Sequence, residues 1–364
     1  MKVLFGYLTY AYRGGSKFQL DFAGNFQNAE IGFITSNKKV EYEDMAKAIG
    51  KIHRIPPTKK LFERMRVMKE LAKEYDILYL NKAVLNPAEL WIAKNAGFKK
   101  VVFHSHAMAK DCSNSVIRGL YHLLHYVSRP FVSFVADAEF ACSESAAEWL
   151  FGKKKGKDAV VIKNGIDLGS FSFSPEMREE KRNELGIHGF CILHVGSFTS
   201  VKNQGYLLEA FRFFHKAHPD CVLYFVGDGE LLDSVKRKVE AWGLSDVVSF
   251  LGQRKDVCSL LQAADLFVLP SLSEGFSFVA LEAQAAGLPC LISSAVPSKI
   301  KINDNVDFFN ISASAAELAE HMEKKMGDSR IQSAESLAEA GYDLRSCAVR
   351  LEQDLEKLLN ENGS

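Results

Sequence analysis

The 364-residue sequence has no long hydrophobic run. No apolar stretch approaches the roughly 18 residues that a membrane span needs, so we predict no transmembrane helix. The apolar start is broken by Gly6, Thr9 and Arg13 and has no small-residue cleavage site, so we interpret Lys2–Tyr7 as a strand rather than a signal peptide. With 47% hydrophobic and 25% charged residues, the composition excludes collagen-like, low-complexity and mainly disordered chains.

The sequence also lacks the cysteine spacing of zinc sites and disulfide frameworks. Its seven cysteines are odd in number and form no Cys-x-x-Cys pair. Most fall in apolar, strand-like segments, such as Cys191 within Phe190–Val195. We therefore expect buried free thiols, no metal site and a reducing, cytoplasmic compartment.

Net charge is absent overall but not locally, since 45 Lys+Arg balance 45 Asp+Glu. Residues 1–160 hold 25 basic and 16 acidic side chains, a net charge of +9, and the remainder carries −9. This asymmetry suggests two bodies with different partners. The basic half could contact anionic lipid at the inner face of the plasma membrane, through Lys51–Lys73, or an anionic acceptor. The alternative is an ordinary solvated surface.

Short apolar segments alternate with amphipathic ones along both halves, which predicts parallel sheets covered on both faces. Two such blocks in series predict an α/β protein with two doubly wound, Rossmann-like domains facing across a cleft. After the first strand, the predicted strands are Ile31–Thr35, Ile77–Asn81, Val101–His104, Glu139–Cys142, Val160–Ile162, Phe190–Val195, Cys221–Val226, Val247–Leu251, Leu266–Leu269 and Pro289–Ile292. The predicted helices are Ser16–Gln27, Leu61–Lys73, Pro87–Ala96, Val116–Val132, Gln204–Ala217, Glu230–Trp242, Val257–Ala263, Ser277–Ala286, Ala315–Lys325, Ile331–Ala340 and Leu344–Leu359.

A polar, irregular stretch around Asn164-Gly165 and Ser170–Pro175 is typical of a linker. We expect an N-terminal domain over residues 1–168 and a C-terminal domain over 169–345. A last helix over 346–364 could pack back toward the N-terminal domain.

The most informative segment follows the strand that ends at Pro270. Its polar, glycine-containing loop leads into a helix that Ser277 can cap. The amides of Gly275, Phe276 and Ser277 would point out of the helix N-terminus, which suits an anion such as a diphosphate.

Two carboxylates accompany this loop, Glu274 just before the helix and Glu282 on it. Like charges repel, so these groups do not bind phosphate, but ionised acceptors make strong hydrogen bonds to sugar hydroxyls. For Glu282 alone, the alternative is a helix-surface residue without a function.

Two glycine turns follow the preceding strands of the same domain. Gly196 with Lys202 allows close backbone approach and supplies a positive charge for phosphate. Gly227 and Gly229 open the next helix, but Leu232 stands where a GxGxxG motif needs its third glycine. Asp228-x-Glu230 in this turn is interpreted as a helix cap rather than a metal-binding pair.

In combination, these segments resemble the retaining family 4 glycosyltransferases of the GT-B fold, and most of all their bacterial capsular and exopolysaccharide subgroup. The C-terminal matches follow the family's order over residues 195–289: Val195-Gly196, Lys202-Asn203-Gln204, Val226–Gly229, Phe250–Gly252, Asp265–Ser271, Ser273–Phe276 and Glu282–Pro289. Looser N-terminal matches are Arg13-Gly14-Gly15, Phe103–His106, Cys142–Ser145 and Asn164–Asp167.

The resemblance implies an acceptor-side N-terminal domain and a donor-binding C-terminal domain. Glu282 would hold the donor ribose, Glu274 would contact the donor sugar, and Lys202 would neutralise the diphosphate. The other implied donor-binding residues are Gly14, Gly15, Gly196, Ser197, Gly227, Gly229, Gly275, Phe276 and Ser277.

His106, with Glu274 and Lys202, completes the implied catalytic set by contacting the transferring sugar or the acceptor. His104 competes with it, because side chains at i and i+2 of a strand point to the same face. We favour His106, which lies nearer the strand end. Domain closure would bring Gly14, Gly15 and His106 onto the donor and exclude water.

One position departs from the family pattern, which has Arg directly after the glycine of the first loop. This chain has Ser197 there. The loss of a charge-assisted contact would cost about 1.5–3 kcal/mol of donor binding unless Arg254 or Lys255 compensates.

The resemblance implies a peripheral, cytoplasmic enzyme of polysaccharide biosynthesis. It would move a hexose from a nucleotide-diphosphate sugar to a glycan acceptor, expected to be lipid-linked, with retention of anomeric configuration. UDP is favoured by family frequency, no cofactor is required, and no Asp-x-Asp is present to hold a metal. The alternatives are a catalytically silent partner protein or another GT-B enzyme, such as a phosphorylase or a sugar-nucleotide epimerase. No module for nucleic-acid binding is recognisable.

Overall fold

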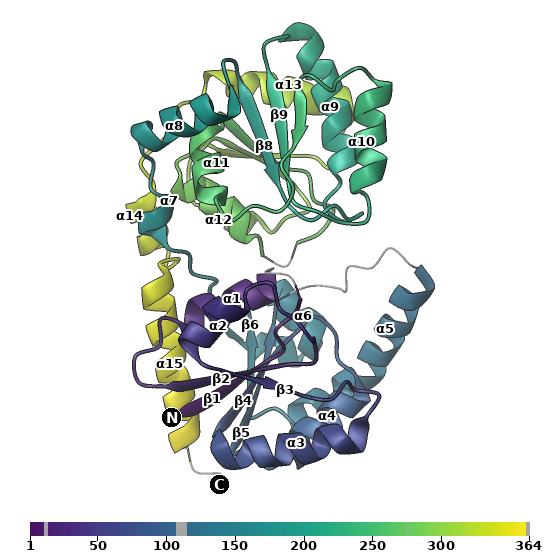
Figure 1. Cartoon of the computed structure of the whole chain (residues 1–364), viewed down its shortest axis with the longest axis vertical. Helices are drawn as coiled ribbons and strands as arrows, with labels where there is room; N and C mark the ends of the chain where they lie inside the picture. The colour runs from purple at the N-terminus through teal and green to yellow at the C-terminus, as the bar shows by residue number, and fades with distance from the viewer. Residues whose placement is uncertain (11–13, 107–114, 275, 362–364) are drawn as a thin grey trace. The chain divides into compact units, whose positions relative to one another are not determined.

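The computed structural model describes residues 1–10, 14–106, 115–274 and 276–361, which form two compact units. Within these residues, unit 1 comprises 1–165 and 341–361, and unit 2 comprises 166–340. Each unit is built on one parallel β-sheet with helices on both faces (Figure 1). No helix among the described residues is both long enough and apolar enough to cross a membrane.

The sheet of unit 1 has the strand order β3-β2-β1-β4-β5-β6-β7, and its neighbouring strands are all parallel. The chain starts in the middle, winds outward to β3, then returns past β1 and winds the other way. The sheet therefore has a topological switch point between β1 and β4, where ligands bind in folds of this kind. Its strands are β1 (Lys2–Gly6), β2 (Glu30–Thr35), β3 (Lys51–Arg54), β4 (Ile77–Lys82), β5 (Lys100–Ser105), β6 (Ala138–Ala141) and β7 (Val160–Val161).

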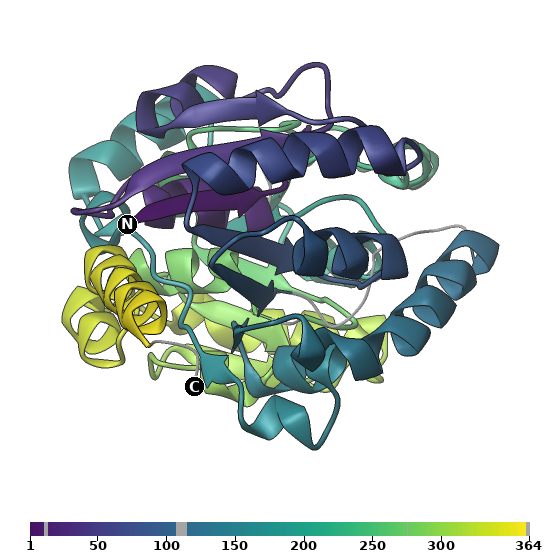
Figure 2. The ribbon, with the colours of Figure 1, turned by 90° about the horizontal axis from the view of Figure 1, so that it is seen from below.

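The helices of unit 1 connect these strands, and the last one returns to the first. Asp343 caps α15 by accepting from Ser346 N, and Glu352 on this helix is buried. Its two carboxylate oxygens accept from the amides of Gln27 (2.8 Å) and Asn28 (2.7 Å), which hold α15 beside the turn after α1 (Figure 2). The helices are α1 (Gly14–Ala23), α2 (Glu43–Ile49), α3 (Leu61–Glu74), α4 (Pro87–Asn95), α5 (Ser115–Ser128), η1 (Arg129–Phe134), α6 (Glu144–Phe151), η2 (Lys155–Lys157) and α15 (Leu344–Asn360).

The sheet of unit 2 repeats this topology, in the order β10-β9-β8-β11-β12-β13. Its central strands are continuous apolar runs, such as Leu266–Leu269, because both faces of the sheet are buried. Its switch point lies between β8 and β11. The strands are β8 (Cys191–Val195), β9 (Val222–Val226), β10 (Val248–Phe250), β11 (Leu266–Leu269), β12 (Cys290–Ser293) and β13 (Val306–Phe309).

Helices α9, α10 and α13 cover one face of this sheet over an aromatic and aliphatic core centred on Phe198, Phe211 and Phe225. Helices α8, α11 and α12 form a second packed group. The unit's helices are α7 (Leu168–Phe171), α8 (Pro175–Leu185), α9 (Gln204–Ala217), α10 (Leu232–Ala241), α11 (Val257–Ala263), α12 (Phe278–Ala285), η3 (Ser298–Ile300), α13 (Ala315–Lys324), η4 (Lys325–Gly327) and α14 (Ala334–Glu339).

The cysteines of the described residues are free, as predicted. Cys142, Cys191, Cys221 and Cys290 are buried. Burial in an apolar interior raises the pKa of the Cys142 thiol to about 12, so this group is inert. No cluster of three metal-ligating side chains occurs in the part of the chain that the structure describes.

Candidate functional site

Each unit gathers polar side chains at the switch point of its own sheet. In unit 2 these groups come from the loop after β8 and the loop after β11, which are neighbouring strands. In unit 1 they come from the ends of β4 and β5 and the start of α1. Since all strands are parallel, these positions share the carboxyl edge of each sheet, where doubly wound folds bind ligands.

An ion pair joins the two loops of unit 2. Lys202 Nζ lies 2.5 Å from Glu274 Oε1, and both side chains are largely buried. Ser271 Oγ donates to the same carboxylate oxygen at 2.7 Å. The structure thus brings together the cation and the first carboxylate that the sequence singled out, although they lie 72 positions apart.

Backbone and amide contacts hold the same loops in register. Leu272 N donates to Val201 O at 2.8 Å, and Asn203 Nδ2 donates to Pro270 O at 3.3 Å. Asn203 has a left-handed backbone, with φ 56°, at the start of α9. The position of Lys202 is therefore fixed from both sides, which is the preorganisation that an electrostatic site needs.

The N-terminus of α12 follows this ion pair. Gly275 lies outside the described residues, Phe276 is half-buried, and Ser277 occupies the N-cap position with an extended backbone. The predicted side-chain cap is wrong, because the Ser277 hydroxyl accepts no bond from α12. Its Oγ is buried without a hydrogen-bond partner among the described residues. A buried, unsatisfied hydroxyl at the N-terminus of a helix is suited to an anionic ligand.

Glu282 lies on α12 and is buried, with 6% of its surface exposed. The alternative interpretation as a helix-surface residue is therefore wrong. Burial is the main cause that raises the pKa of the Cys258 thiol, and the charge of Glu282 also raises it. Because Cys258 belongs to α11, Glu282 lies on the side of α12 that approaches α11. An ionised carboxylate makes strong hydrogen bonds to hydroxyl groups, and those of a ribose are of that kind.

His194 lies one residue before the end of β8 and is fully buried. Its Nδ1 donates to Val268 O at 2.9 Å, which leaves Nε2 as an acceptor without a partner in the described chain. This Nε2 lies 3.2 Å from where a Cβ on residue 196 would stand. Burial lowers the pKa of His194 to about 4, and the nearby charge of Lys202 acts in the same direction. The ring is therefore neutral at physiological pH.

The glycine turns at this edge are sterically required. Gly227 and Gly229 have φ values of 131° and 158°, and a Cβ on either would collide with the backbone of Gly196 or Phe198. Asp228 accepts from Gly229 N at 2.7 Å within the turn. The predicted helix cap by Asp228-x-Glu230 is wrong, because α10 begins two residues later, after Leu231.

Of the two cations expected to compensate for Ser197, Arg254 forms an ion pair with an aspartate. Ser197 is half-buried, and its carbonyl accepts from Gln204 Nε2 at 2.9 Å. Arg254 is held by Asp256 through two bonds of 2.7 and 2.6 Å. These contacts lower the pKa of Asp256 and tie the guanidinium to its own loop.

In unit 1, the predicted glycine loop is the first turn of a helix. Arg13 lies outside the described residues, and Gly14 and Gly15 open α1. A Cβ at either glycine would meet nothing within 4 Å, and the first amides of a helix have no partner within it. Ser16, the predicted N-cap, lies inside the helix, and its Oγ lies 2.9 Å from Thr9 Oγ1.

His104 and His106 lie on one face, as their spacing predicts, with ring centroids 3.9 Å apart. His104 is fully buried, and its Nδ1 lies 2.5 Å from Tyr79 Oη. His106, just after β5, donates from Nε2 to Asn81 Oδ1 at 2.9 Å. Desolvation lowers the pKa of His106 to about 3, so its ring is neutral. Phe18 of α1 packs against both rings.

This arrangement leaves one acceptor and one donor without partners. His106 Nδ1 and Asn81 Nδ2 are buried without hydrogen-bond partners among the described residues. Hydroxyl groups suit both atoms, because a hydroxyl donates and accepts. Sequence reasoning missed Asn81 and Tyr79. The feature that could have indicated Asn81 is the polar pair Asn81-Lys82, which ends the apolar strand β4 next to β5.

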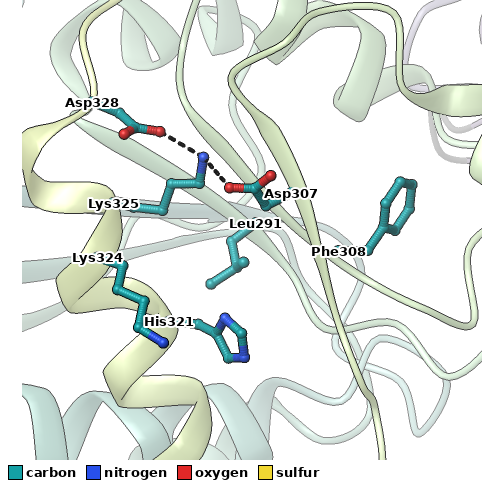
Figure 3. A pocket seen from close by; sticks show the side chains of 7 residues that line it. All are labelled: Leu291, Asp307, Phe308, His321, Lys324, Lys325 and Asp328. Carbon is teal, nitrogen blue, oxygen red and sulfur yellow. Dashed lines mark hydrogen bonds and ion pairs between the residues drawn. The ribbon is translucent and has the colours of Figure 1, made fainter.

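A cavity of about 260 Å³ in unit 2 lies apart from these residues (Figure 3). Leu291 and Asp307 line it from the second positions of β12 and β13, toward the amino ends of the strands. Lys325 Nζ lies 2.5 Å from carboxylate oxygens of both Asp307 and Asp328, which offset its charge. This cavity is not part of the candidate site.

Comparison with known proteins gives partial matches in sequence and a full match in fold. The sequence model of the family “Glycosyl transferases group 1” matches residues 177–344. “Putative glycosyltransferase EpsF” of Bacillus subtilis (strain 168) is 32% identical over 225 residues, 60% of this chain and 59% of that protein. The Escherichia coli “UDP-Gal:alpha-D-GlcNAc-diphosphoundecaprenol alpha-1,3-galactosyltransferase” is 36% identical over 156 residues, 42% of this chain and 40% of that protein. The matches thus span 40% to 59% of these relatives' lengths.

The crystal structure of Anabaena Alr3699/HepE in complex with UDP-glucose covers 98% of this chain and 100% of that chain, with a TM-score of 0.83 and 21% identity. This protein and the Anabaena structure are alike in fold. Two Rossmann-like units with parallel sheets define the GT-B fold class. The predicted fold class of two doubly wound, Rossmann-like domains is therefore confirmed. The family model supports a relationship to the glycosyltransferase group 1 family for residues 177–344.

Proposed function

We propose that this chain is a glycosyltransferase that moves a hexose from a UDP-sugar to a glycan acceptor. One observation carries the proposal. At the switch point of unit 2, the Lys202–Glu274 pair lies next to the N-terminus of α12, where the buried Ser277 Oγ has no partner in the described residues. A cation and helix amides suit a diphosphate, and the adjacent carboxylate suits sugar hydroxyls.

In this reaction, the groups at the carboxyl edge of the unit 2 sheet would have to stabilise the leaving group. When the bond between the anomeric carbon and the diphosphate oxygen breaks, negative charge develops on the diphosphate. Lys202 and the amides at the start of α12 would stabilise that charge without moving, because the surrounding contacts already hold them. Glu274 would position the sugar, and Glu282 would bind the ribose.

Unit 1 would supply the acceptor side. His106 Nδ1 and Asn81 Nδ2 would bind hydroxyls of the transferring sugar or of the acceptor. Gly14 and Gly15 would offer helix amides to a phosphate. Because His106 is neutral and has a free acceptor nitrogen, it can receive a hydrogen bond from a hydroxyl at physiological pH.

The proposed donor and acceptor are based on the names of similar proteins. The E. coli relative acts with UDP-Gal on a diphosphoundecaprenol-linked sugar, and the Anabaena structure holds UDP-glucose. We extend these to a UDP-sugar donor and a lipid-linked acceptor in polysaccharide biosynthesis. We also propose retention of configuration and charge stabilisation by protein groups in place of a metal.

The test is a panel of UDP-sugars with a diphosphoundecaprenol-linked acceptor, read as UDP release and product formation. Glu274→Ala should lower kcat/KM by about a hundredfold or more. Glu230→Ala, a carboxylate exposed at the same edge, should stay within about twofold of wild type. Proton NMR of the fresh product reports the anomeric configuration. Equal activity of Glu274→Ala and wild type would contradict the assigned role.

A catalytically silent relative is the second candidate, and the Ser197 position favours it. No arginine follows Gly196, and Arg254 is committed to Asp256. Nucleotide binding without turnover of any UDP-sugar, together with co-purification of an active transferase, would support this candidate instead.

A further inference from the structure

Helix α5 of unit 1 exposes its apolar face and buries polar side chains. Leu120, Leu123 and Val127 share one helical face, and all three are exposed, Leu123 by 60%. His125 and Ser128 on the same helix are fully buried. A helix packed on a soluble protein normally buries its apolar face and exposes its polar side chains. The exposed apolar face of α5 therefore indicates an interaction surface.

The apolar surface continues into η1. Phe131 and Phe134 are exposed by 58% and 71%, next to the exposed Tyr126 at the end of α5. Both views show α5 standing out from the body of unit 1 (Figures 1 and 2). We call the side chains of Leu120, Leu123, Val127, Phe131 and Phe134 the α5–η1 face.

The root of α5 is fixed, so this face cannot turn inward. His125 Nδ1 accepts from Leu85 N at 3.3 Å, and its Nε2 donates to Trp149 O at 3.0 Å. The His125 and Trp149 rings stack with centroids 4.5 Å apart, and Trp149 Nε1 donates to Ala83 O at 2.6 Å. Rotation of α5 would break the contacts of His125 with Leu85 and Trp149.

Exposed lysines adjoin the α5–η1 face. Lys153, Lys154, Lys155 and Lys157 form no ion pair within the residues that the structure describes, and Lys155 Nζ lies 5.4 Å from the ring centre of Phe134. Glu148 and Asp158 are the exposed acidic groups near them in sequence.

Two lysines of the basic stretch Lys51–Lys73 differ in this respect. Lys60 pairs with Glu63 at 3.1 Å and Lys73 pairs with Glu70 at 2.7 Å. The charges of Lys60 and Lys73 are therefore offset by neighbouring carboxylates, whereas those of the 153–157 cluster are not.

We propose that the α5–η1 face and the lysine cluster form a docking surface for an anionic lipid bilayer. The aliphatic and aromatic side chains enter the boundary between headgroups and acyl chains, and the lysines contact lipid phosphates. Aliphatic and aromatic side chains beside basic ones are the composition of interfacial anchors. The proposal is independent of the donor site in unit 2, so its failure leaves the transferase proposal untouched.

The test is co-sedimentation of the full chain with phosphatidylcholine vesicles containing about one third phosphatidylglycerol. Wild type should bind these vesicles, and binding should weaken with added salt and with pure phosphatidylcholine. Leu123→Gln/Phe131→Gln should lower the partition coefficient by about tenfold or more. Lys153→Gln/Lys154→Gln/Lys157→Gln should lower it specifically for the anionic vesicles.

Matched controls lie on α3. Phe62 is 82% exposed, so Phe62→Gln removes a comparable apolar side chain, and Lys60→Gln/Lys73→Gln removes comparable charge. Both controls should bind as wild type does. Absence of wild-type binding, or loss of binding in the α3 variants alone, would overturn the proposal. So would a concentration-dependent dimer that Leu123→Gln/Phe131→Gln dissociates without any vesicle binding, since the face would then contact a second copy.

Discussion

Lys202 Nζ and Glu274 Oε1 lie 2.5 Å apart and bridge the loops that follow two neighbouring strands, β8 and β11. With side chains only 19% and 11% exposed, the pair is desolvated enough to matter for stability. In the absence of a ligand, each group satisfies the other. The ion pair therefore belongs both to the folded state and to the proposed chemistry.

The first prediction concerns the energy of this pair. Lys202→Met and Glu274→Gln should each lower the free energy of unfolding, and the double variant should lose less than the sum, with a coupling of about 1–2 kcal/mol. Urea unfolding of the four proteins measures this. The exposed Lys60–Glu63 pair is the control, with coupling below about 0.5 kcal/mol. Equal coupling in the two pairs would contradict the account.

A second prediction separates binding from folding at the start of α12. Because Ser277 Oγ makes no hydrogen bond within the described residues, Ser277→Ala should leave the melting temperature nearly unchanged. If the hydroxyl binds a phosphate oxygen, the variant should bind UDP about tenfold more weakly, as calorimetry would show. Ser271→Ala breaks a bond to Glu274 and should instead lower stability. Unchanged UDP affinity in Ser277→Ala would remove Ser277 from the site.

The third prediction uses the open space around the first turn of α1. Gly14→Ala and Gly15→Ala meet no atom within 4 Å, so stability should be kept or rise by about 0.5 kcal/mol. Transfer activity should nevertheless fall if a phosphate approaches this backbone. Gly227→Ala, whose Cβ would strike Gly196, should instead destabilise unit 2. Full activity in both α1 variants would show that no ligand comes close to these amides.

Stability should also depend on pH through His194, whose pKa is about 4 in the folded protein. The unfolded chain, with a pKa near 6.5, binds the proton more readily, so this contribution is complete above pH 6.5 and is lost as pH falls toward 4. His194 alone should remove about 2 kcal/mol between pH 7 and pH 5. Urea unfolding should show a flatter pH dependence for His194→Asn than for wild type. A wild-type profile that stays flat over this range would contradict the assignment.

Much of the fold could be predicted because central strands are continuous apolar runs between amphipathic helices. The strands that sequence reasoning missed, β3 and β13, lie at sheet edges and carry polar residues such as Lys51, His53 and Asp307. Edge strands are covered less completely, so their hydrophobic pattern is weaker.

The residue types of the site could be predicted, but their contacts could not. Glycine turns and strand ends indicated Lys202 and Glu274, whereas their ion pair depends on the order of β8 and β11. Asn81 is visible only once β4 and β5 are paired, since it then faces His106. The expected helix caps at Ser277 and Asp228 are wrong. The capping rule considers only neighbouring positions in the sequence, and it takes no account of contacts with the surrounding loops.

The most direct test of the central claim is a thermal-shift titration with UDP, GDP, ADP and CMP, each with and without magnesium. The account predicts a selective shift with UDP that magnesium does not change, with stabilisation of about 2.7 kcal/mol at a hundredfold excess over Kd. Glu282→Ala should abolish most of this shift. No shift with any nucleotide would contradict the account, and would direct attention to the Ser197 departure.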